Sequence, residues 1–205
     1  MPSSLQIKSR ERVRQLAEVY TADREINSML DLVGVAAFNI DYKWLEPACG
    51  NGNFLVKILE RKLISVCSRA RRQDEFEFYT LIALASIYAI DIDQENIAEA
   101  RLRLEALILA IYSDRQNTKK MKPGFKRSLG YILMHTVLVG DSINGADRIF
   151  FTEFGSPKPL YFQERVYRFS DIIAANKTPN SVRLLRPIET YRPCHYTRLG
   201  LRHDQ

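Results

Sequence analysis

Apolar residues recur at two periods along this chain and predict helices that alternate with short strands. Residues 5–33 alternate apolar and polar positions at helical spacing, which predicts one or two amphipathic helices before the first strand. Later segments with helical patterning lie at about 52–63, 74–86 and 94–112. Three short apolar runs, each ending in an acid or followed by one, lie at 43–46, 87–92 and 135–139. Such runs are typical of buried strands in a parallel sheet.

The order strand, helix, strand, helix, strand predicts an α/β fold built on a doubly wound sheet. Ligands of such sheets bind beyond the carboxyl ends of the strands, where Glu46, Asp91 and Asp141 fall. The aromatic cluster Phe76, Phe78 and Tyr79 lies on the second predicted helix and suits either a core helix or a dimer face.

The second half of the chain has weaker patterning. Residues 148–153 and 160–169 are predicted to form strands or a hairpin, whereas Pro123-Gly124 predicts a loop within the basic segment 114–130. We therefore divide the chain into three parts: an N-terminal helical region (1–40), an α/β domain (41–173) and a basic, proline-containing irregular tail (174–205).

Composition places the chain among soluble globular proteins. It has 205 residues, 46% of them hydrophobic and 26% charged, which suits one domain with a substantial core. No apolar run is long enough for a membrane span, and residues 1–8 lack the hydrophobic core of a signal peptide. The three cysteines, Cys49, Cys67 and Cys194, are scattered, which favours a reducing cytoplasm, and neither they nor the three histidines have metal-ligand spacing.

Positive charge is concentrated in two segments of a chain whose net charge is +6. The tail from residue 177 carries several arginines, and the segment 114–130 carries six cations against one acid. We predict that the latter binds nucleic acid through Lys119, Lys120, Lys122, Lys126 and Arg127. Both segments suit a phosphate-backbone partner, and the alternative is a solubilising loop and tail.

A two-glycine turn follows the first predicted strand and is the most informative motif of the chain. Gly50 and Gly52 would allow a tight turn that brings backbone N–H groups against a ligand. The third glycine of a dinucleotide fingerprint is replaced by Leu55, and the Lys-Ser/Thr ending of a phosphate loop is missing. A dinucleotide-dependent oxidoreductase is therefore the least favoured class.

The stretch Glu-Pro-Ala-Cys-Gly-Asn-Gly-Asn-Phe, residues 46–54, resembles the cofactor loop of S-adenosylmethionine-dependent methyltransferases. More narrowly, it is similar to that of DNA adenine-N6 methylases of restriction–modification or phage type. The resemblance implies a Rossmann-like sheet and S-adenosylmethionine as the cofactor. It implies cofactor contacts from this loop at Glu46, Pro47, Ala48, Gly50, Gly52, Asn53 and Phe54.

Three further elements follow the family order. The resemblance implies that Asp91 accepts hydrogen bonds from ribose, Ile92 borders adenine, and Asp141 accepts from the exocyclic amine of the cofactor. Upstream, residues 17–22 resemble a Gly-Glu-Val-Phe-Thr-Pro element, which implies a role for Tyr20 and for Thr21 at the methionine carboxylate. That element has Ala17 and Ala22 in place of the flanking glycine and proline.

Several of these residues also suit purely structural roles. Asp91 and Asp93 could form a solvated helix start, with Asp93 as the N-cap of the helix that begins near residue 94. Tyr20 could face the core and Thr21 could cap a helix. The long spacing between Gly50 and Asp91 is interpreted as an insertion in the crossover between the two strands.

The catalytic (Asn/Asp/Ser)-Pro-Pro-(Tyr/Phe) element of the family has no clear counterpart. The nearest residues are Ser156, Pro157 and Tyr161, whose prolines are separated by Lys158, so a degenerate site and a proline-rich turn are both open. Only 64 residues follow Asp141, which implies a shortened and divergent second half.

These observations favour an S-adenosylmethionine-dependent DNA methyltransferase that acts on an exocyclic base amine. The first alternative is a catalytically incomplete methylase-like subunit, or a cofactor- or DNA-binding module, that needs a partner chain. The second is an RNA or protein methyltransferase, against which only the Thr21 element argues. A homodimer and a complex with a methylase or restriction subunit are the assemblies considered.

Overall fold

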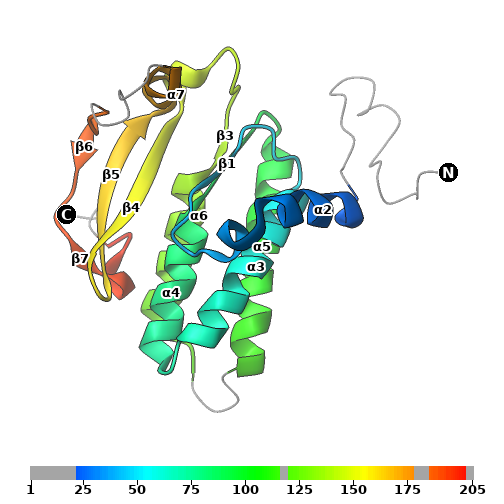
Figure 1. The fold of residues 1–205 in the computed structure, drawn as a ribbon. Helices are drawn as coiled ribbons and strands as arrows, with labels where there is room; N and C mark the ends of the chain where they lie inside the picture. Colours follow the sequence, from blue (N-terminus) through cyan, green and yellow to red (C-terminus); the bar gives the residue numbers. More distant parts are fainter. Residues whose placement is uncertain (1–21, 116–119, 178–184, 202–205) are drawn as a thin grey trace.

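The protein is a mixed α/β structure with a parallel and an antiparallel sheet (Figure 1). The computed structural model describes residues 22–115, 120–177 and 185–201. The parallel sheet has the order β1-β2-β3, with strands β1 (Trp44–Glu46), β2 (Ile87–Asp91) and β3 (Val137–Val139). Of the predicted doubly wound α/β fold, the α/β class and the three parallel strands are confirmed, although each strand is short.

Two helical crossovers connect these strands. The first contains α3 (Asn53–Arg69) and α4 (Gln73–Ala85), and the second contains α5 (Gln94–Arg115) and α6 (Pro123–Thr136). The chain moves in one direction across the sheet, from β1 to β2 to β3, so right-handed crossovers put all four helices on the same face. The predicted insertion between Gly50 and Asp91 is the second helix of the first crossover, α4.

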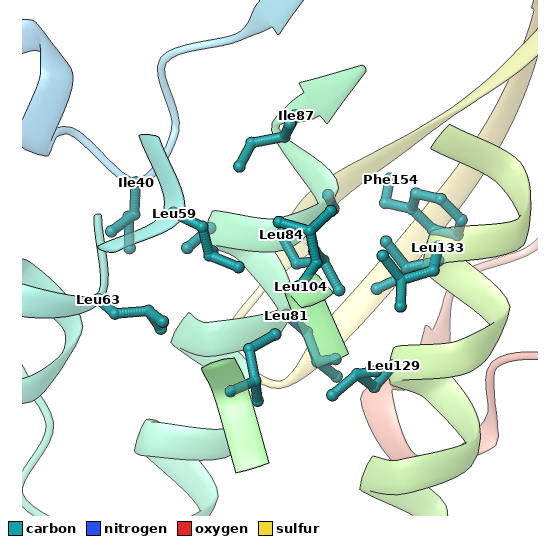
Figure 2. Close-up of a cluster of buried hydrophobic side chains, with 14 of the residues drawn as sticks. Ile40, Leu59, Leu63, Leu81, Leu84, Ile87, Leu104, Leu129, Leu133 and Phe154 are labelled. Carbon is teal, nitrogen blue, oxygen red and sulfur yellow. The ribbon is translucent and has the colours of Figure 1, made fainter. Parts of the chain in front are cut away.

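Alternating residues of β2 divide the core between the two faces of the parallel sheet. Ile87 and Ala89 are fully buried in the large cluster formed with the helices, part of which is shown in Figure 2. Ile90 points to the other face and joins a smaller cluster with Phe151 and Phe169. This alternation follows from the two-residue period of a strand, and it explains why the whole strand is apolar.

The second sheet is built on a long hairpin. Strands β4 (Phe150–Lys158) and β5 (Tyr161–Arg168) pair along their length, and β5 also pairs with β6 (Glu189–Thr190) and β7 (Cys194–His195). Phe162 of β5 packs against Phe78 of α4, with ring centroids 5.1 Å apart. The hairpin therefore covers α4 and α6 as well as the second face of the parallel sheet, and the predicted hairpin is confirmed.

Helix α4 is a core helix. Phe76 is fully buried and Phe78 nearly so, because the helix lies among α3, α6 and β4. The sequence left a core helix and a dimer face as possibilities for the aromatic cluster 76–79. For Phe76 and Phe78, the structure shows a core helix.

The remaining elements flank the two sheets. Helix α2 (Asp23–Val33) packs against α3 through an ion pair between Arg61 and Asp31 at 2.6 Å. The shorter or peripheral segments are η1 (Gly34–Phe38), η2 (Ala146–Arg148), α7 (Phe169–Lys177) and η4 (Tyr196–Arg198).

Two sequence predictions about irregular segments are wrong. Pro123-Gly124 begins a helix rather than a loop, because proline is well tolerated at the first helical position and the buried Phe125, Leu129 and Leu133 follow at helical spacing. The same helix extends through His135, so the third strand begins only at Val137.

The tail from residue 174 is likewise not irregular throughout. Ala174 lies inside α7, and later residues form β6, β7 and η4. Tyr196 and Leu199 are fully buried, so burial of a few large side chains fixes this proline-containing segment against the helices.

A charged side chain lies inside the core at the amino-terminal end of the parallel sheet. Lys62 of α3 is fully buried, and its ammonium donates to the carbonyls of Asn39 and Tyr42 at 2.8 and 2.7 Å and to Ser86 Oγ at 2.7 Å. These contacts join the segment before β1 to the end of α4. Among the helices of residues 22–115, 120–177 and 185–201, none is long and apolar enough to cross a bilayer.

Candidate functional site

The glycine turn continues the parallel sheet beyond the end of β1. The Cys49 N–H donates to the Ile90 carbonyl at 3.0 Å, and the Gly52 N–H donates to the Cys49 carbonyl at 3.0 Å. Gly50 and Gly52 have φ angles of +53° and +83°, a region that favours glycine. The turn therefore requires glycine at both positions for backbone reasons.

Gly52 is also required for packing between helices. A Cβ atom at this position would lie 2.8 Å from the Cβ of Ala100 on α5. The start of α3 can approach α5 this closely because neither residue has a larger side chain. Gly52 is thus both the left-handed N-cap of α3 and a helix-contact residue.

Asp91 joins the turn to the next strand end. Its Oδ2 accepts from the Gly50 N–H at 2.8 Å, and its Oδ1 accepts from the Asp93 N–H at 2.9 Å. The Asp91 carbonyl accepts from the Gly140 N–H at 2.9 Å. One residue thus connects the loops that follow all three parallel strands, which are far apart in the sequence.

Helix α5 supports the turn from the side through two residues that the sequence did not single out. Glu99 accepts from Asn51 Nδ2 at 2.9 Å, and Arg103 donates to the Asn51 carbonyl at 3.0 Å and to Asn53 Oδ1 at 2.6 Å. Glu99 and Arg103 are four residues apart and share a helix face with Ala100. That spacing was visible in the sequence, but nothing in it showed which residues the face would contact.

One acceptor in the turn has no partner among the described residues. Asn51 Oδ1 is buried and receives no hydrogen bond from the part of the chain that the structure describes. An orphaned buried acceptor costs free energy unless something else donates to it. Its position inside the glycine turn is consistent with a ligand or water at this place.

Two acidic side chains at the strand ends differ in their surroundings. Burial raises the pKa of Glu46, whose carboxylate receives, from the described residues, only a long contact of 3.4 Å from the Ala48 N–H. Asp141 instead accepts from the N–H groups of Ile143 and Asn144 at 2.9 Å, and these bonds lower its pKa. Most of the acceptor capacity of Asp141 therefore serves its own loop, while that of Glu46 remains available.

The surroundings of Cys49 keep its thiol protonated and buried. The side chain is buried, and burial together with the nearby charges of Asp91 and Glu46 raises the pKa of its thiol to about 12. A protonated thiol is a weak nucleophile. Its burial in the large core cluster makes Cys49 a packing residue.

Apolar side chains are exposed around the same edge of the sheet. Ile92, directly after Asp91, is 63% exposed, and Leu45 and Val139 are 45% and 47% exposed. Pro47 and Ala48 are exposed in the turn, and Phe54 is half-buried against Trp44. Acceptors next to exposed apolar groups are the surroundings that an amphipathic heterocyclic ligand requires.

Among the other predicted cofactor residues, Tyr20 and Thr21 lie outside the described residues. Asp93 is an N-cap, as the alternative interpretation predicted: its Oδ1 accepts from the Glu95 N–H at 2.7 Å. The structure therefore brings together Glu46, the turn residues 47–54, Asp91, Ile92 and Asp141, and leaves Asp93 to helix α5.

The catalytic candidates Ser156, Pro157 and Tyr161 lie elsewhere. They belong to the tip of the β4–β5 hairpin, where Tyr161 pairs with His195 of β7 and the Tyr196 N–H donates to the Leu160 carbonyl at 2.8 Å. Lys122 at the start of α6 donates to Tyr196 OH, whereas Asp141 follows the other end of α6. Since α6 has 14 residues, about 21 Å of helix separates the two places (Figure 1).

The predicted nucleic-acid residues also lie at the hairpin-tip end of the molecule. Lys120, Lys122, Lys126 and Arg127 precede or form the first turns of α6, while Lys119 is outside the described residues. They are therefore about one helix length away from the glycine turn.

No group of His, Cys, Asp and Glu side chains in the described ranges is arranged to hold a metal ion. Comparisons with protein-family models, curated proteins and solved structures gave no match for this chain. Function is therefore inferred from the geometry of the turn and of the surfaces around it.

Proposed function

We propose that this chain binds S-adenosylmethionine at the glycine turn and acts in methyl transfer to an exocyclic amine of a nucleic-acid base. The observation that carries the proposal is the convergence at Asp91, which hydrogen-bonds the glycine turn after β1 and the loop after β3. On this proposal the three parallel strands form one half of a Rossmann-like methyltransferase sheet.

The residues at this edge suit the parts of that cofactor. Asp91 and Ile92 offer an acceptor for ribose hydroxyls and an apolar surface for adenine. Glu46 offers a carboxylate to the ammonium of the methionine part, and Asn51 offers its orphaned acceptor. The wider set that we propose for cofactor contact comprises Tyr20, Thr21, Pro47, Ala48, Gly50, Gly52, Asn53, Phe54 and Asp141.

The contribution of the protein to such a reaction is positioning. The bound cofactor supplies an activated methyl group, and transfer to an amine requires the lone pair of the amine to be held in line with that group. Glu99 and Asp91 accept hydrogen bonds from the turn and Arg103 donates to it, and these bonds hold the turn in one conformation before any ligand arrives.

A second candidate function is that of a methylase-like subunit that works with a partner chain. It is favoured by the separation between the glycine turn and Ser156, Pro157 and Tyr161. Among the described strands, β1 pairs only with β2, so its outer edge is open to further strands. A cavity of about 540 Å³ lies beside this edge, between Leu45 and Tyr88 on one side and Phe151 and Tyr167 on the other.

Calorimetric titration of the purified chain with S-adenosylmethionine, with NAD as the comparison ligand, tests the proposal. We expect binding of the first ligand alone. In the variant Asp91→Asn, which replaces a carboxylate oxygen by a donor, the affinity should fall about tenfold or more, since a hydrogen bond to a charged acceptor contributes about 1.5–3 kcal/mol.

Asp114→Asn is the matched control, because Asp114 is exposed near the far end of α5. It should bind as the unaltered chain does, and thermal unfolding of both variants shows whether Asp91→Asn still folds. Binding of NAD, or unchanged affinity in a folded Asp91→Asn variant, would contradict the proposal.

Methyl transfer is the separate question that distinguishes the two candidates. Labelled cofactor with unmethylated DNA, RNA or protein as the acceptor gives product only if the chain is active alone. Cofactor binding without transfer to any acceptor would favour the subunit.

A further inference from the structure

Two basic segments that are far apart in the sequence meet at the hairpin-tip end of the molecule. Helix α6 begins there, and η4 packs on its first turns: Arg127 donates to the Thr197 carbonyl at 2.6 Å, and Lys122 donates to Tyr196 OH at 2.9 Å. A Cβ at Gly124 would lie 2.6 Å from Thr197, so the two segments are in close contact. The described cations of the predicted nucleic-acid segment and Arg198 therefore share one surface.

A cavity of about 680 Å³ opens beside these cations. It is lined by aromatic and cationic side chains, chiefly Tyr161, Tyr191, Arg192, His195 and Arg198. None of the described residues that line it is acidic. A concave site with rings and positive charge suits a planar ligand that carries a negative charge.

Several cations near the cavity form no ion pair with a described acid. Lys126, Arg127, Lys158 and Arg198 are exposed and form no ion pair with a described residue, whereas Lys122 lies 3.6 Å from the buried Glu77. Four described acids lie nearby. Asp74 of α4 interacts with His195 and Tyr196, and Glu77 contacts Lys122. Glu189 accepts from Tyr191 OH, and Glu164 interacts with Tyr191. The positive charge of the surface is therefore only partly compensated within the protein.

The rings at the cavity are partly exposed. Tyr161, Tyr191 and His195 are each half-buried, and the ring planes of Tyr161 and His195 are at 89° with centroids 5.6 Å apart. Lys158 Nζ lies 3.9 Å from the Tyr161 ring centroid. Burial and the charge of Lys122 lower the pKa of His195, which favours the neutral imidazole, and the ring adds an aromatic surface.

We infer that this surface, formed by the start of α6, the hairpin tip and residues 191–198, binds single-stranded nucleic acid. An unpaired base enters the cavity and stacks on its rings, and the flanking phosphates contact the cations. A duplex is the weaker ligand, because its bases are stacked on one another and cannot present a face to a protein ring.

This inference deepens the proposed function by naming a single strand as its nucleic-acid partner. It rests on the proposed function only in taking the planar, negatively charged ligand to be a nucleic acid. The surface is about one helix length from the glycine turn, so it holds a segment of the strand away from the reacting base. Binding can be measured without cofactor, and failure here leaves cofactor binding untouched.

Fluorescence anisotropy with a labelled 12-nucleotide single strand, the same sequence as a duplex, and a polyglutamate peptide tests the inference. We expect the single strand to bind more tightly than the duplex and the peptide. Raising the salt from 50 to 200 mM should weaken binding about tenfold or more, as displaced counterions require when several phosphates are contacted.

The decisive variant is the pair Arg192→Ala with Arg198→Ala, two exposed residues at the cavity. It should weaken single-strand binding about tenfold. The matched control is the pair Arg24→Ala with Arg148→Ala, which removes the same charge from exposed positions on α2 and η2 and should change affinity less than about twofold. Circular dichroism shows whether each pair folds.

Tyr161→Leu separates stacking from charge, because it removes a ring and keeps every cation. It should weaken the single strand and leave the polyglutamate peptide unaffected. Equal losses from the two arginine pairs, a duplex or peptide that binds as tightly as the single strand, or no binding at 50 mM salt would each overturn the inference.

Discussion

Single residues at the glycine turn have several tasks at once. Gly52 supplies a left-handed backbone, caps α3 and lets α5 approach. Asp91 accepts from two backbone N–H groups of its own fold and is also the acceptor that we propose for a ribose. A change at either position therefore affects stability and binding together, and tests of function need a stability measurement beside them.

Alanine at two glycines should have opposite effects on stability. Gly52→Ala places a Cβ 2.8 Å from Ala100 at a positive φ, so we expect destabilisation by about 1–3 kcal/mol. Gly130→Ala, inside α6 with nothing within 4 Å of the new Cβ, should stabilise the protein by about 0.5–1 kcal/mol. Denaturant unfolding of both variants measures the two changes, and equal signs would contradict the packing argument.

For single residues, the sequence predicted which side chains lie at the strand ends better than it predicted their hydrogen-bond partners. Spacing after apolar runs located Glu46, Asp91 and Asp141 at strand ends, because that pattern is local. The sequence could not show that Asp141 accepts hydrogen bonds from the N–H groups of Ile143 and Asn144, because an acid after a strand can bind either its own loop or a ligand. Arg103 acts across 50 positions on Asn53, and no local pattern reports such a contact.

The elements were predictable where apolar periodicity was strong. Helices α3 to α5 and the β4–β5 hairpin follow from their patterns, with ends that differ by several residues at most. Helix α6 was missed because Pro123-Gly124 and its cations outweighed the buried positions at Phe125, Leu129 and Leu133. Proline at a first helical position looks, in sequence, like proline in a loop.

The C-terminal segment is held to the helices by a buried polar cluster. Glu77 of α4 is fully buried and accepts from Tyr196 OH at 2.6 Å and from Tyr112 OH at 2.8 Å. Burial and the contact with Glu77 raise the pKa of both tyrosines, which therefore stay protonated as donors. The cluster explains how residues with weak patterning become ordered against α4 and α6.

Tyr196→Phe tests this cluster. It removes a donor to a buried carboxylate while keeping the ring, so we expect destabilisation by about 1.5–3 kcal/mol. Tyr79→Phe on the same helix as Glu77 is the control, because Tyr79 packs on Arg69 through its ring, which phenylalanine retains. Thermal unfolding measures both, and equal midpoints for the two variants would show that the hydrogen bond to Glu77 contributes nothing.

At the scale of the whole molecule, the parallel sheet lies between two unlike layers. Its four crossover helices cover one face, and the hairpin with α7 covers the other. The sequence predicted the α/β class from its alternating elements. It did not predict what packs on the second face, because that packing consists of long-range contacts of Phe151 and Phe169 with Ile90. The basic hairpin-tip end and the glycine turn lie at opposite ends of α6. The order of the motifs along the sequence did not indicate this separation.

Lys62 joins these layers at the amino-terminal end of the sheet and should make stability depend on pH. Burial lowers the pKa of Lys62 to about 7 from an ordinary value of 10.5. Between these values the unfolded chain holds a proton that the folded protein has released, so the free energy of unfolding rises with pH across this window. Below pH 7 both states are protonated, and this contribution no longer changes.

Lys62→Met removes the titrating group and should remove that rise. Urea unfolding from pH 6 to 9 should give a steeper increase for the unaltered protein above pH 7, by up to about 1.4 kcal/mol per pH unit for one proton. Lys126→Met, at an exposed position of α6, is the control and should keep the wild-type slope. Equal slopes for Lys62→Met and the unaltered chain would mean that the oxygens around the ammonium keep it charged, so that burial alone does not set its protonation.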